Sequence, residues 1–398
     1  MEKIKKIKGR QVFDSRGNPT VEAEVYTENL SATAIVPSGA STGTYEAFEL
    51  RDKGNKDYLD KSVFNSVENI NGPISKALIN IDVNDQSLID KILIETDGTK
   101  QKKKLGANSI LSVSMAACRL GAMHNKKPLY KHLKHSNNYT LPTPLLNVIN
   151  GGVHAKNNLD IQEFMIRPEK CRSFSEAIQK SFLVIQNLKQ IVDNTNVGDE
   201  GGFSPNLDSA EEAIETILKA IEKSNLKPGK DITLCLDVAA NELKKSLSID
   251  YYLNLIKKYP IVSIEDPFGE DEWELWKKLS EKTDIQVVGD DLFVTNVERL
   301  KKGIKEKSAN AILIKLNQIG TVTETLKTIK LAQDNSFKTV ISHRSGDSED
   351  TFIADLAVAT NSSQIKTGSL ARSERVSKYN RLIRIQEELG NSGKMAKI

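Results

Sequence analysis

Short apolar runs alternate with amphipathic stretches through the second half of the 398-residue chain. The apolar runs predict buried strands at 232–238, 261–268, 285–292, 311–316, 339–344 and 363–367. Between them, apolar residues recur with helical spacing, for example at 273–282, 297–305 and 323–334. Buried strands that alternate with such helices indicate a parallel sheet covered on both faces, and six successive units favour a closed (β/α)8-type TIM barrel in the α/β class.

The region before the barrel has a different pattern. Residues 3–36 read as a meander of strands with an Asn-Pro turn signal, and helical patterns follow at about 62–80 and 105–124. A sheet followed by helices predicts an α+β domain. A polar, proline-containing segment at 135–144 marks the boundary, so we expect an N-terminal α+β domain over 1–135 and a barrel domain over 136–398.

Every predicted barrel strand from residue 232 onward delivers a charged or polar side chain at its C-terminal end. These side chains are Asp237, Glu265, Asp290, Lys315, His343 and Lys366. One acidic residue after a strand is usually a helix cap, but the same pattern in six strands indicates a shared site. In a TIM barrel the active site lies at this end of the strands.

The three carboxylates suggest a metal site. Asp237, Glu265 and Asp290 offer hard oxygen ligands from neighbouring strands, which suits Mg²⁺. A divalent cation would also relieve their mutual repulsion. A metal-free network of ion pairs with the two lysines is the alternative. Asp266, beside Glu265, is expected to orient the metal ligands.

Lys315 and Lys366 end buried strands, and lysine is rarely buried without a partner or a task. Near a cation and near each other, either lysine could have a lowered pKa and take a proton from carbon. Proton removal beside a carboxylate creates a dianionic enediolate, whose charge requires metal and cationic side chains. The carboxylates and lysines therefore form one coherent set.

Composition and charge indicate which partners and which cellular compartment to expect. A net charge of +3 with 27% charged residues gives no strong field of one sign, so neither nucleic acid nor a membrane surface is an expected partner. Three widely separated cysteines suit a reducing compartment and offer no zinc spacing. No apolar run has membrane-spanning length, and no signal-peptide core is present at the start. We expect a cytoplasmic location; a secondary cell-surface location is not deducible.

A series of short motifs gives a more specific indication. In chain order they include DSRGNPTVE (14–22), PSGASTG (37–43), NGGVHA (150–155), QEFMI (162–166), GDEGGFSP (198–205), SIEDPF, GDDL, NQIGT (317–321), SHRSGDSEDTFIADLAV (342–358), IKTGS (365–369) and ARSER (371–375). With these motifs the chain closely resembles enolases, the lyases also called phosphopyruvate hydratases. The resemblance implies the reversible, Mg²⁺-dependent dehydration of 2-phosphoglycerate to phosphoenolpyruvate in glycolysis and gluconeogenesis.

The resemblance also implies roles for individual residues. Lys315 would remove the C2 proton, and Glu200 would protonate the departing C3 hydroxyl. Without the resemblance, Glu200 in its Gly-rich turn would suggest only local hydrogen bonding. The other implied catalytic residues are Glu163, His154 and His343, and the implied substrate-binding residues are Gln162, Glu163, His154, Lys315, Arg344, Ser345 and Lys366. Arg344 and Ser345 would hold the phosphate, and Lys366 would face the carboxylate of this three-carbon acid.

Further implications concern metals and assembly. Ser41, in the PSGASTG loop that closes over the site, would help to bind a second Mg²⁺, giving two per active site. The resemblance also implies a homodimer or a larger homo-oligomer. One departure is the segment between Asp237 and Ile261, which is shorter than in most enolases. A crossover helix at about 250–258 still fits there, but any surface contact that this loop serves is in doubt.

Two other functions are alternatives to the enolase reaction. Racemases and cycloisomerases of the same superfamily share the barrel and the acidic triad, but they usually place the lysine base earlier than Lys315. A non-catalytic enolase-like protein would normally have lost the acid, the base or the metal ligands, and all are present here. The sequence therefore favours the enolase reaction, while a secondary binding role stays open.

Overall fold

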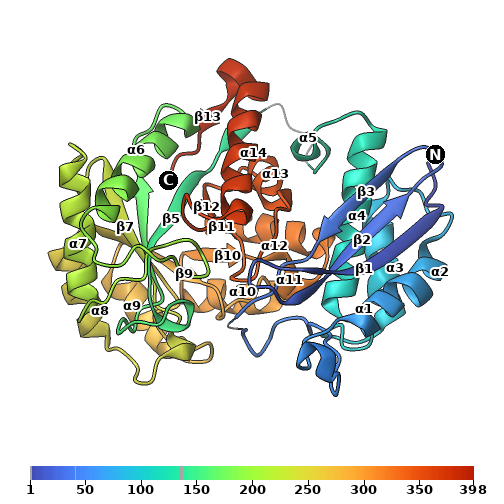
Figure 1. Ribbon diagram of the computed structural model, residues 1–398, viewed down its shortest axis with the longest axis horizontal. Helices are drawn as coiled ribbons and strands as arrows, with labels where there is room; N and C mark the ends of the chain where they lie inside the picture. Colours follow the sequence, from blue (N-terminus) through green and yellow to red (C-terminus); the bar gives the residue numbers. More distant parts are fainter. Residues whose placement is uncertain (1, 41, 134–137) are drawn as a thin grey trace.

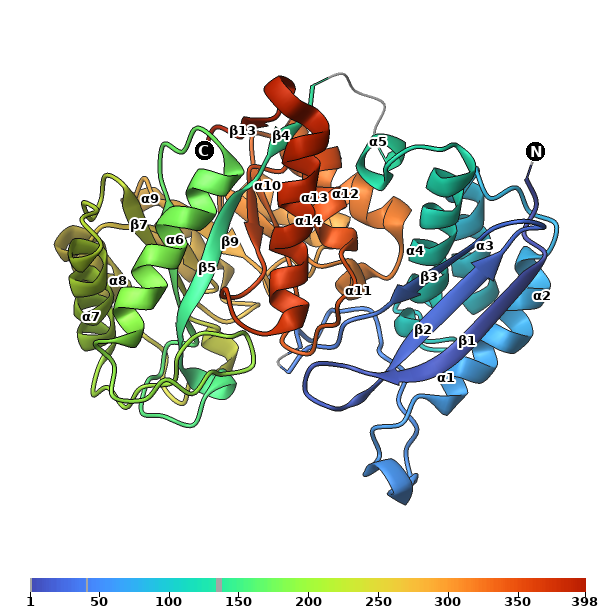
Figure 2. The ribbon, with the colours of Figure 1, turned by 45° about the horizontal axis from the view of Figure 1, so that its top comes forward.

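A computed structural model describes residues 2–40, 42–133 and 138–398. Figures 1 and 2 show a barrel with surrounding helices and, beside it, a smaller part that contains an antiparallel sheet. The expected boundary at 135/136 lies outside the described residues. Within the described residues, no helix is both long and apolar enough to cross a membrane.

The N-terminal part begins with the predicted meander. It consists of β1 (Lys6–Phe13), β2 (Pro19–Tyr26) and β3 (Ser31–Ile35), paired antiparallel in that order. Along β2, Val21, Ala23 and Val25 are buried while the alternate residues are partly exposed, which is the expected period of a half-buried strand. The helices of this part are η1 (Lys56–Tyr58), α1 (Phe64–Asn69), the π-helical turn η2 (Ile70–Ile74), α2 (Ser75–Leu78), α3 (Gln86–Asp97), α4 (Ala107–His124) and α5 (Leu129–Leu133).

Helix α4 packs against β2 and β3 of the sheet. Small residues of this helix such as Ala116 and Ala117 are fully buried. The sequence predicted this helix and the helical region of α1 and α2. Helix α3 was not predicted, although its N-cap Asp85 accepts a hydrogen bond from the Leu88 amide and its C-cap is Gly98.

The second part is the predicted closed barrel. Its strands are β5 (Thr143–Asn150), β6 (Glu163–Pro168), β7 (Ile232–Asp237), β8 (Ile261–Glu265), β9 (Gln286–Gly289), β10 (Ala311–Ile314), β11 (Lys338–Ser342) and β12 (Gln364–Lys366). A compact apolar cluster that includes Leu145, Met165, Cys235, Leu313 and Val340 gathers one residue from each of several of these strands. The barrel is therefore packed with side chains rather than open.

Helices surround the barrel between its strands. They are α6 (Phe174–Lys189), α7 (Ala210–Lys223), α8 (Ile249–Lys258), α9 (Trp273–Lys282), α10 (Val297–Glu306), the short α11 (Leu316–Ile319), α12 (Val322–Asp334), α13 (Phe352–Ala359) and α14 (Ser373–Leu389). The predicted helices at 273–282, 297–305 and 323–334 are confirmed as α9, α10 and α12. Helix α8 confirms that the shortened segment still holds a crossover helix. Two short strands, β4 (Thr140–Leu141) and β13 (Lys394–Met395), pair in parallel outside the barrel.

The six strands predicted from residue 232 onward, β7 to β12, run parallel as expected, whereas β6 runs antiparallel to both β5 and β7. The connection from β5 to β6 covers residues 151–162 and holds only the single turn η3 (Gly152–His154). A short connection without a crossover helix joins antiparallel strands, so β6 returns in the opposite direction. The start of β6, at Glu163, consequently lies at the barrel end where the other strands finish.

Residues of the N-terminal part cap a barrel helix. The Thr323 amide at the start of α12 donates to Asp90 Oδ2 (2.8 Å), and the Val322 amide donates to Ser114 Oγ (3.0 Å). Lys102 Nζ lies 3.1 Å from Glu324 in the same turn. These contacts join α3 and α4 to the helix that follows α11 and Lys315. The capping therefore fixes the position of the N-terminal part relative to the end of β10.

This capping predicts an effect on stability. Replacing the buried Asp90 with alanine leaves the partly buried Thr323 amide without its acceptor, so the free energy of unfolding should fall by about 1–3 kcal/mol. Urea-induced unfolding measures this loss. Asp85→Ala is the control, because Asp85 caps α3 at an exposed position and its loss should cost only about 1 kcal/mol. An Asp90→Ala protein no less stable than the Asp85→Ala protein would contradict the proposed capping.

Candidate active site

The six strand-end side chains lie at one end of the barrel. Asp237 and Glu265 are the last residues of β7 and β8 and are paired in register, and Lys366 is the last residue of β12. The other three follow their strands directly: Asp290 after β9, Lys315 after β10 and His343 after β11. The structure therefore brings together the residues that the sequence placed at strand ends.

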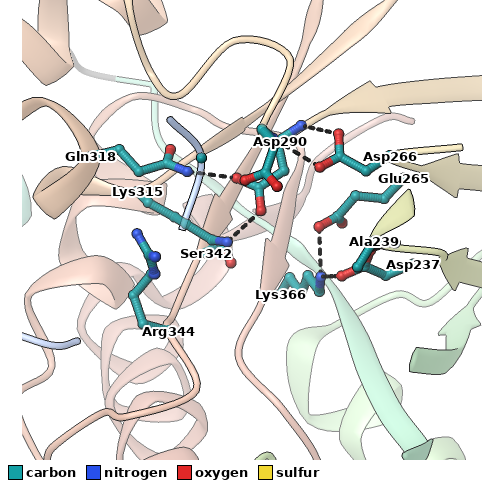
Figure 3. A network of polar contacts seen from close by, with 12 residues as sticks. Asp237, Ala239, Glu265, Asp266, Asp290, Lys315, Gln318, Ser342, Arg344 and Lys366 are labelled. Carbon is teal, nitrogen blue, oxygen red and sulfur yellow. Dashed lines mark hydrogen bonds and ion pairs between the residues drawn. The ribbon is translucent and has the colours of Figure 1, made fainter. Parts of the chain in front are cut away.

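Lys366 lies between acidic side chains, as Figure 3 shows. Its Nζ is 2.7 Å from Asp237 Oδ2, 2.7 Å from Glu265 Oε1 and 3.2 Å from Glu163 Oε1. Burial alone would lower the pKa of Lys366, but these carboxylates hold it well above its ordinary value. Lys366 is therefore a permanent cation in this arrangement.

Lys315 pairs with Asp290 at 2.5 Å (Figure 3). Burial would lower the pKa of Lys315, and Asp290 raises it above the ordinary value in spite of the opposing charges of Arg344 and Lys366. Burial would raise the pKa of Asp290, yet Lys315 holds it low. Both partners are thus charged, and the predicted base carries a proton in this state.

Gln318 completes this cluster, although no individual role was predicted for it. Its Nε2 donates to Asp290 Oδ1 (2.8 Å), while its Oε1 accepts from Thr295 Oγ1 (2.8 Å). Thr295 Oγ1 accepts in turn from the Lys315 amide (2.9 Å). Gln318 belongs to the NQIGT motif and lies one helical turn after Lys315, which was the available signal.

Asp266 holds the segment after β9. Its two carboxylate oxygens accept from the amides of Asp290 (2.9 Å) and Asp291 (2.8 Å), and Asp266 itself has φ of 43°. The left-handed conformation is one that aspartate tolerates better than most residues. The predicted orienting role thus has a direct geometric basis, since the carboxylate fixes the backbone that carries Asp290.

A second group of titratable side chains comes from loops and from the start of β6. Glu163 is the first residue of β6, His154 ends η3, and Glu200 lies between α6 and α7. His154 Nδ1 is 3.8 Å from both Glu163 Oε1 and Glu200 Oε1, and His343 Nε2 is 3.3 Å from Glu200 Oε1. Asn147 Nδ2 donates to Glu200 Oε2 at 3.2 Å.

The two glutamates are shifted in opposite directions. Burial, followed by the nearby Glu200, raises the pKa of Glu163 well above its ordinary value. Burial would also raise the pKa of Glu200, but His343 and His154 hold it well below its ordinary value. Burial lowers the pKa of His343 to about 4 and also lowers that of His154. These opposite shifts favour a proton on Glu163 over one on Glu200.

Several buried polar atoms here have no hydrogen bond. They are His154 Nδ1, Gln162 Oε1, Glu163 Oε2 and His343 Nε2. All four residues line one cavity of about 20 Å³, together with Lys315, Arg344, Ser345 and Lys366. Such a cavity has room for about one water molecule. Unpaired polar atoms in a protein interior are costly and rare, so their concentration here indicates a ligand-binding site.

The residues predicted to bind phosphate contact the N-terminal part. The Arg344 guanidinium donates to both oxygens of Glu46 (2.9 and 3.2 Å), and Ser345 Oγ accepts from the Ala40 amide (2.6 Å). Glu46 and Ala40 belong to the segment that contains the PSGASTG motif. Ser41 of that motif lies outside the described residues. Glu46 was not predicted, because nothing in the sequence pairs it with a residue 298 positions away.

The donor set suits Mg²⁺. Hard carboxylate oxygens are gathered at adjacent strand ends, and Lys366 and Lys315 now neutralise them. Among the described residues, two sets have ligand atoms within 4.8 Å of one another: Asp266, Asp290 and Asp291, and His154, Glu163 and Glu200. Asp237 and Glu265 are instead drawn together by the Lys366 ammonium group. A cation that took over this neutralising role would fit the chemistry of the site.

Comparison with known proteins identifies the family. The family model described as the C-terminal TIM barrel domain of enolase matches residues 138–248 and 244–398, and the model of the enolase N-terminal domain matches 4–133. The chain is also 61% identical to the enolase of Pelagibacter ubique (strain HTCC1062) over 417 aligned positions, which cover 100% of both chains. The chain belongs to the enolase family.

The predicted enolase resemblance, the TIM-barrel fold and the lyase activity of a phosphopyruvate hydratase are thereby confirmed. Membership of the enolase family also implies Mg²⁺. The alignment has 417 positions although this chain has 398 residues, so the relative contains residues that this enolase lacks. The barrel model matches in two pieces that meet at 244–248. This meeting point falls in the segment between β7 and α8 that the sequence marked as short.

The geometry of Asp266 predicts an effect on metal affinity. Asp266→Asn replaces one of the two acceptors that hold the backbone around Asp290, so Mg²⁺ affinity should fall about 10–100-fold. The dependence of activity on Mg²⁺ concentration, together with calorimetric titration of Mg²⁺, measures the change. Asp284→Asn is the control, because Asp284 is exposed before the other end of β9. Equal Mg²⁺ affinities for the two variants would contradict the orienting role.

Proposed function

We propose that this enolase dehydrates 2-phosphoglycerate reversibly, with Lys315 as the base at C2 and Glu200 as the acid for the C3 hydroxyl. The main support is the set of unpaired buried polar atoms around one cavity. That cavity is lined by the candidate base, the candidate acid and the candidate phosphate ligands together. Membership of the enolase family implies the substrate class, a small phosphorylated three-carbon acid.

Lys315 has to lose its proton before it can act as a base. Asp290 favours the charged lysine, whereas Arg344 and Lys366 oppose it. Once Asp290 is neutralised by another cation, the remaining positive neighbours lower the pKa of Lys315. In the forward reaction the C2–H bond breaks, the proton passes to Lys315, and the electron pair of that bond is left in the enediolate.

Glu200 assists the second step. Hydroxide is a poor leaving group, so an acid has to protonate the C3 oxygen as its bond to carbon breaks. We assign to Glu163 and Glu200 one shared proton. The opposite shifts of their pKa values favour it on Glu163 in this state, so it has to pass to Glu200 before Glu200 acts as the acid. In this scheme Glu200 delivers the proton, water leaves, and the C2–C3 double bond forms. His154 and His343 contact the acid rather than the base.

Asp237, Glu265 and Asp290 are the proposed ligands of one Mg²⁺, and Ser41 is the proposed ligand of a second. These cations would supply positive charge to the substrate carboxylate and its enediolate. Lys366 adds charge on the same side, since it bonds Asp237 and Glu265 directly. Gln162 lies beside this group, with an unpaired Oε1.

Arg344 and Ser345 are the proposed phosphate ligands. A guanidinium binds a phosphate through two parallel hydrogen bonds, and Arg344 already makes this type of contact with Glu46. A cavity of about 20 Å³ cannot hold the substrate, so the segment around Ala40 has to move outward for entry. Its return would exclude water from the reaction.

The remaining proposals concern domain boundaries, oligomeric state and location. We propose an N-terminal domain over 1–135, a barrel domain over 136–398, a homodimer or larger homo-oligomer, and a cytoplasmic location. Nucleic acid is not an expected partner, because the net charge is only +3. Sedimentation equilibrium would test the oligomer, and a monomer at micromolar concentration would contradict it.

The assignment of base and acid predicts two distinct defects. Lys315→Ala should lose both phosphoenolpyruvate formation and exchange of the C2 proton with solvent, by at least about 100-fold each. Glu200→Gln should lose phosphoenolpyruvate formation but keep C2 exchange, because proton removal precedes loss of the hydroxyl. Ultraviolet absorbance of phosphoenolpyruvate and NMR in deuterated water measure the two processes.

Wild type with excess chelator should be inactive and should recover when Mg²⁺ is restored. Lys330→Ala is the matched control for Lys315→Ala, because Lys330 is exposed on α12 and pairs with Asp334 on the same helix. C2 exchange that survives in Lys315→Ala would refute the assignment of the base. A folded, metal-loaded wild type without turnover would refute the proposed function as a whole.

A further inference from the structure

Arg375 is a fully buried arginine in α14 that reaches the backbone behind the site. Its Nη1 lies 2.5 Å from His343 Nδ1 and donates to the carbonyl oxygen of Arg344 (2.6 Å). Its Nη2 donates to the carbonyl oxygens of Ser345 (2.6 Å) and Asp199 (3.1 Å). Arg375 therefore contacts the backbone of both candidate phosphate ligands and the ring of a candidate catalytic histidine.

The contact with His343 has only one chemical reading. A guanidinium carries hydrogen-bond donors and no acceptor, so the ring nitrogen that faces it has to accept. Nδ1 of His343 consequently carries no proton, and in a neutral ring the proton is then on Nε2. We propose that Arg375 is a positioning residue that fixes His343 as the Nε2–H tautomer and directs this N–H toward Glu200. This inference rests on the proposed function of Glu200.

The fixed tautomer determines what His343 can do. Nε2 lies 3.3 Å from Glu200 Oε1 and is not aligned for a full hydrogen bond to it. The N–H is thus available to both the acid and an oxygen atom of a bound substrate. His343 cannot accept a proton at Nε2, and Nδ1 faces a cation. His343 is therefore a neutral donor that orients Glu200, not an acid–base group that exchanges protons.

The surroundings of His343 support a neutral ring. Burial and the adjacent Arg375 charge oppose protonation, while Glu200 and Asp347 favour it, and burial dominates with a pKa of about 4. Asp347 is itself engaged by Lys378 Nζ at 2.9 Å. The only cation in direct contact with the ring among the described residues is Arg375.

The chain makes room for Arg375 at Gly368, in the IKTGS motif. A Cβ there would lie 2.5 Å from the Glu200 carbonyl oxygen and 2.9 Å from Arg375 Cδ, and Gly368 has φ of 78°. Only glycine permits both this backbone conformation and this close approach. Gly368 thus allows Arg375 and the backbone of Glu200 to pack against the same turn.

NMR of the ring nitrogens tests the proposal directly. The chain has five histidines, so selective ¹⁵N labelling and a His343→Gln variant assign the signals of His343. The wild type should show His343 only as the Nε2–H tautomer between about pH 5.5 and 8, whether or not the protein turns over substrate. An imidazolium, an Nδ1–H tautomer or a mixture in the wild type would overturn the proposal.

Variants test the role of Arg375. Arg375→Gln should release the tautomer, because the glutamine amide can turn either its donor or its acceptor toward Nδ1, and kcat should fall about tenfold with little change in KM. Arg375→Lys keeps a cationic donor and should retain the Nε2–H tautomer and most of kcat. An Arg375→Gln protein with an unchanged tautomer and kcat would also refute the proposal.

Lys378→Gln is the matched control. Lys378 is buried on the same helix and supports the same loop through Asp347 and the Ser348 carbonyl, but it does not contact His343. The Lys378→Gln variant should lose stability but keep His343 as the Nε2–H tautomer. A changed tautomer in this variant would show that the tautomer depends on the general rigidity of the loop and not on Arg375. If the wild type shows the Nε2–H tautomer but no enolase turnover, the proposed function fails and the tautomer assignment stands.

Discussion

A group of buried carboxylates lies at one end of the barrel, where each one repels the others. Its members are Glu163, Glu200, Asp237, Glu265 and Asp290. Burying even one unpaired charge is costly, and a group of acids is tolerated only when cations and donors surround it. Lys366 neutralises one side, Lys315 neutralises another, and two histidines face Glu200. The fold can be understood as the framework that brings these groups to one point.

That requirement explains the layout of the barrel and its neighbour. The parallel strands deliver Asp237, Glu265 and the lysines from their C-terminal ends, while the reversed β6 delivers Glu163 from its start. The N-terminal part contributes a further acid, Glu46, to Arg344. Behind the site, two cationic side chains of α14 hold the loop after β11. Arg375 donates to the carbonyl oxygen of Arg344, and Lys378 forms an ion pair with Asp347. Charge balance therefore extends well beyond the cavity itself.

The sequence identified the strand-end residues, because strand periodicity and the common direction of barrel strands place them together. It did not predict the direction of β6, since a buried antiparallel strand has the same apolar pattern as a parallel one. Glu163, His154 and Glu200 lie in loops or at a strand start, so only the resemblance to enolases identified them. Gln318, Glu46 and Arg375 were missed because their partners are set by three-dimensional contact. The short segment after β7 was recognised from its length, and the two-piece family match agrees with it.

The pairing of Arg344 with Glu46 has a consequence for selectivity. The protein supplies an anion of its own to the guanidinium, so any ligand that uses Arg344 first has to replace an internal competitor. The apparent affinity of such a ligand is lower than its intrinsic affinity by the fraction of molecules in which the guanidinium is available. A doubly charged phosphate can displace Glu46 from the guanidinium. A ligand carboxylate that binds Arg344 no more tightly than Glu46 does gains no free energy by the exchange. If Arg344 binds the substrate phosphate as proposed, this internal competition would set a threshold that favours phosphorylated acids over their unphosphorylated analogues.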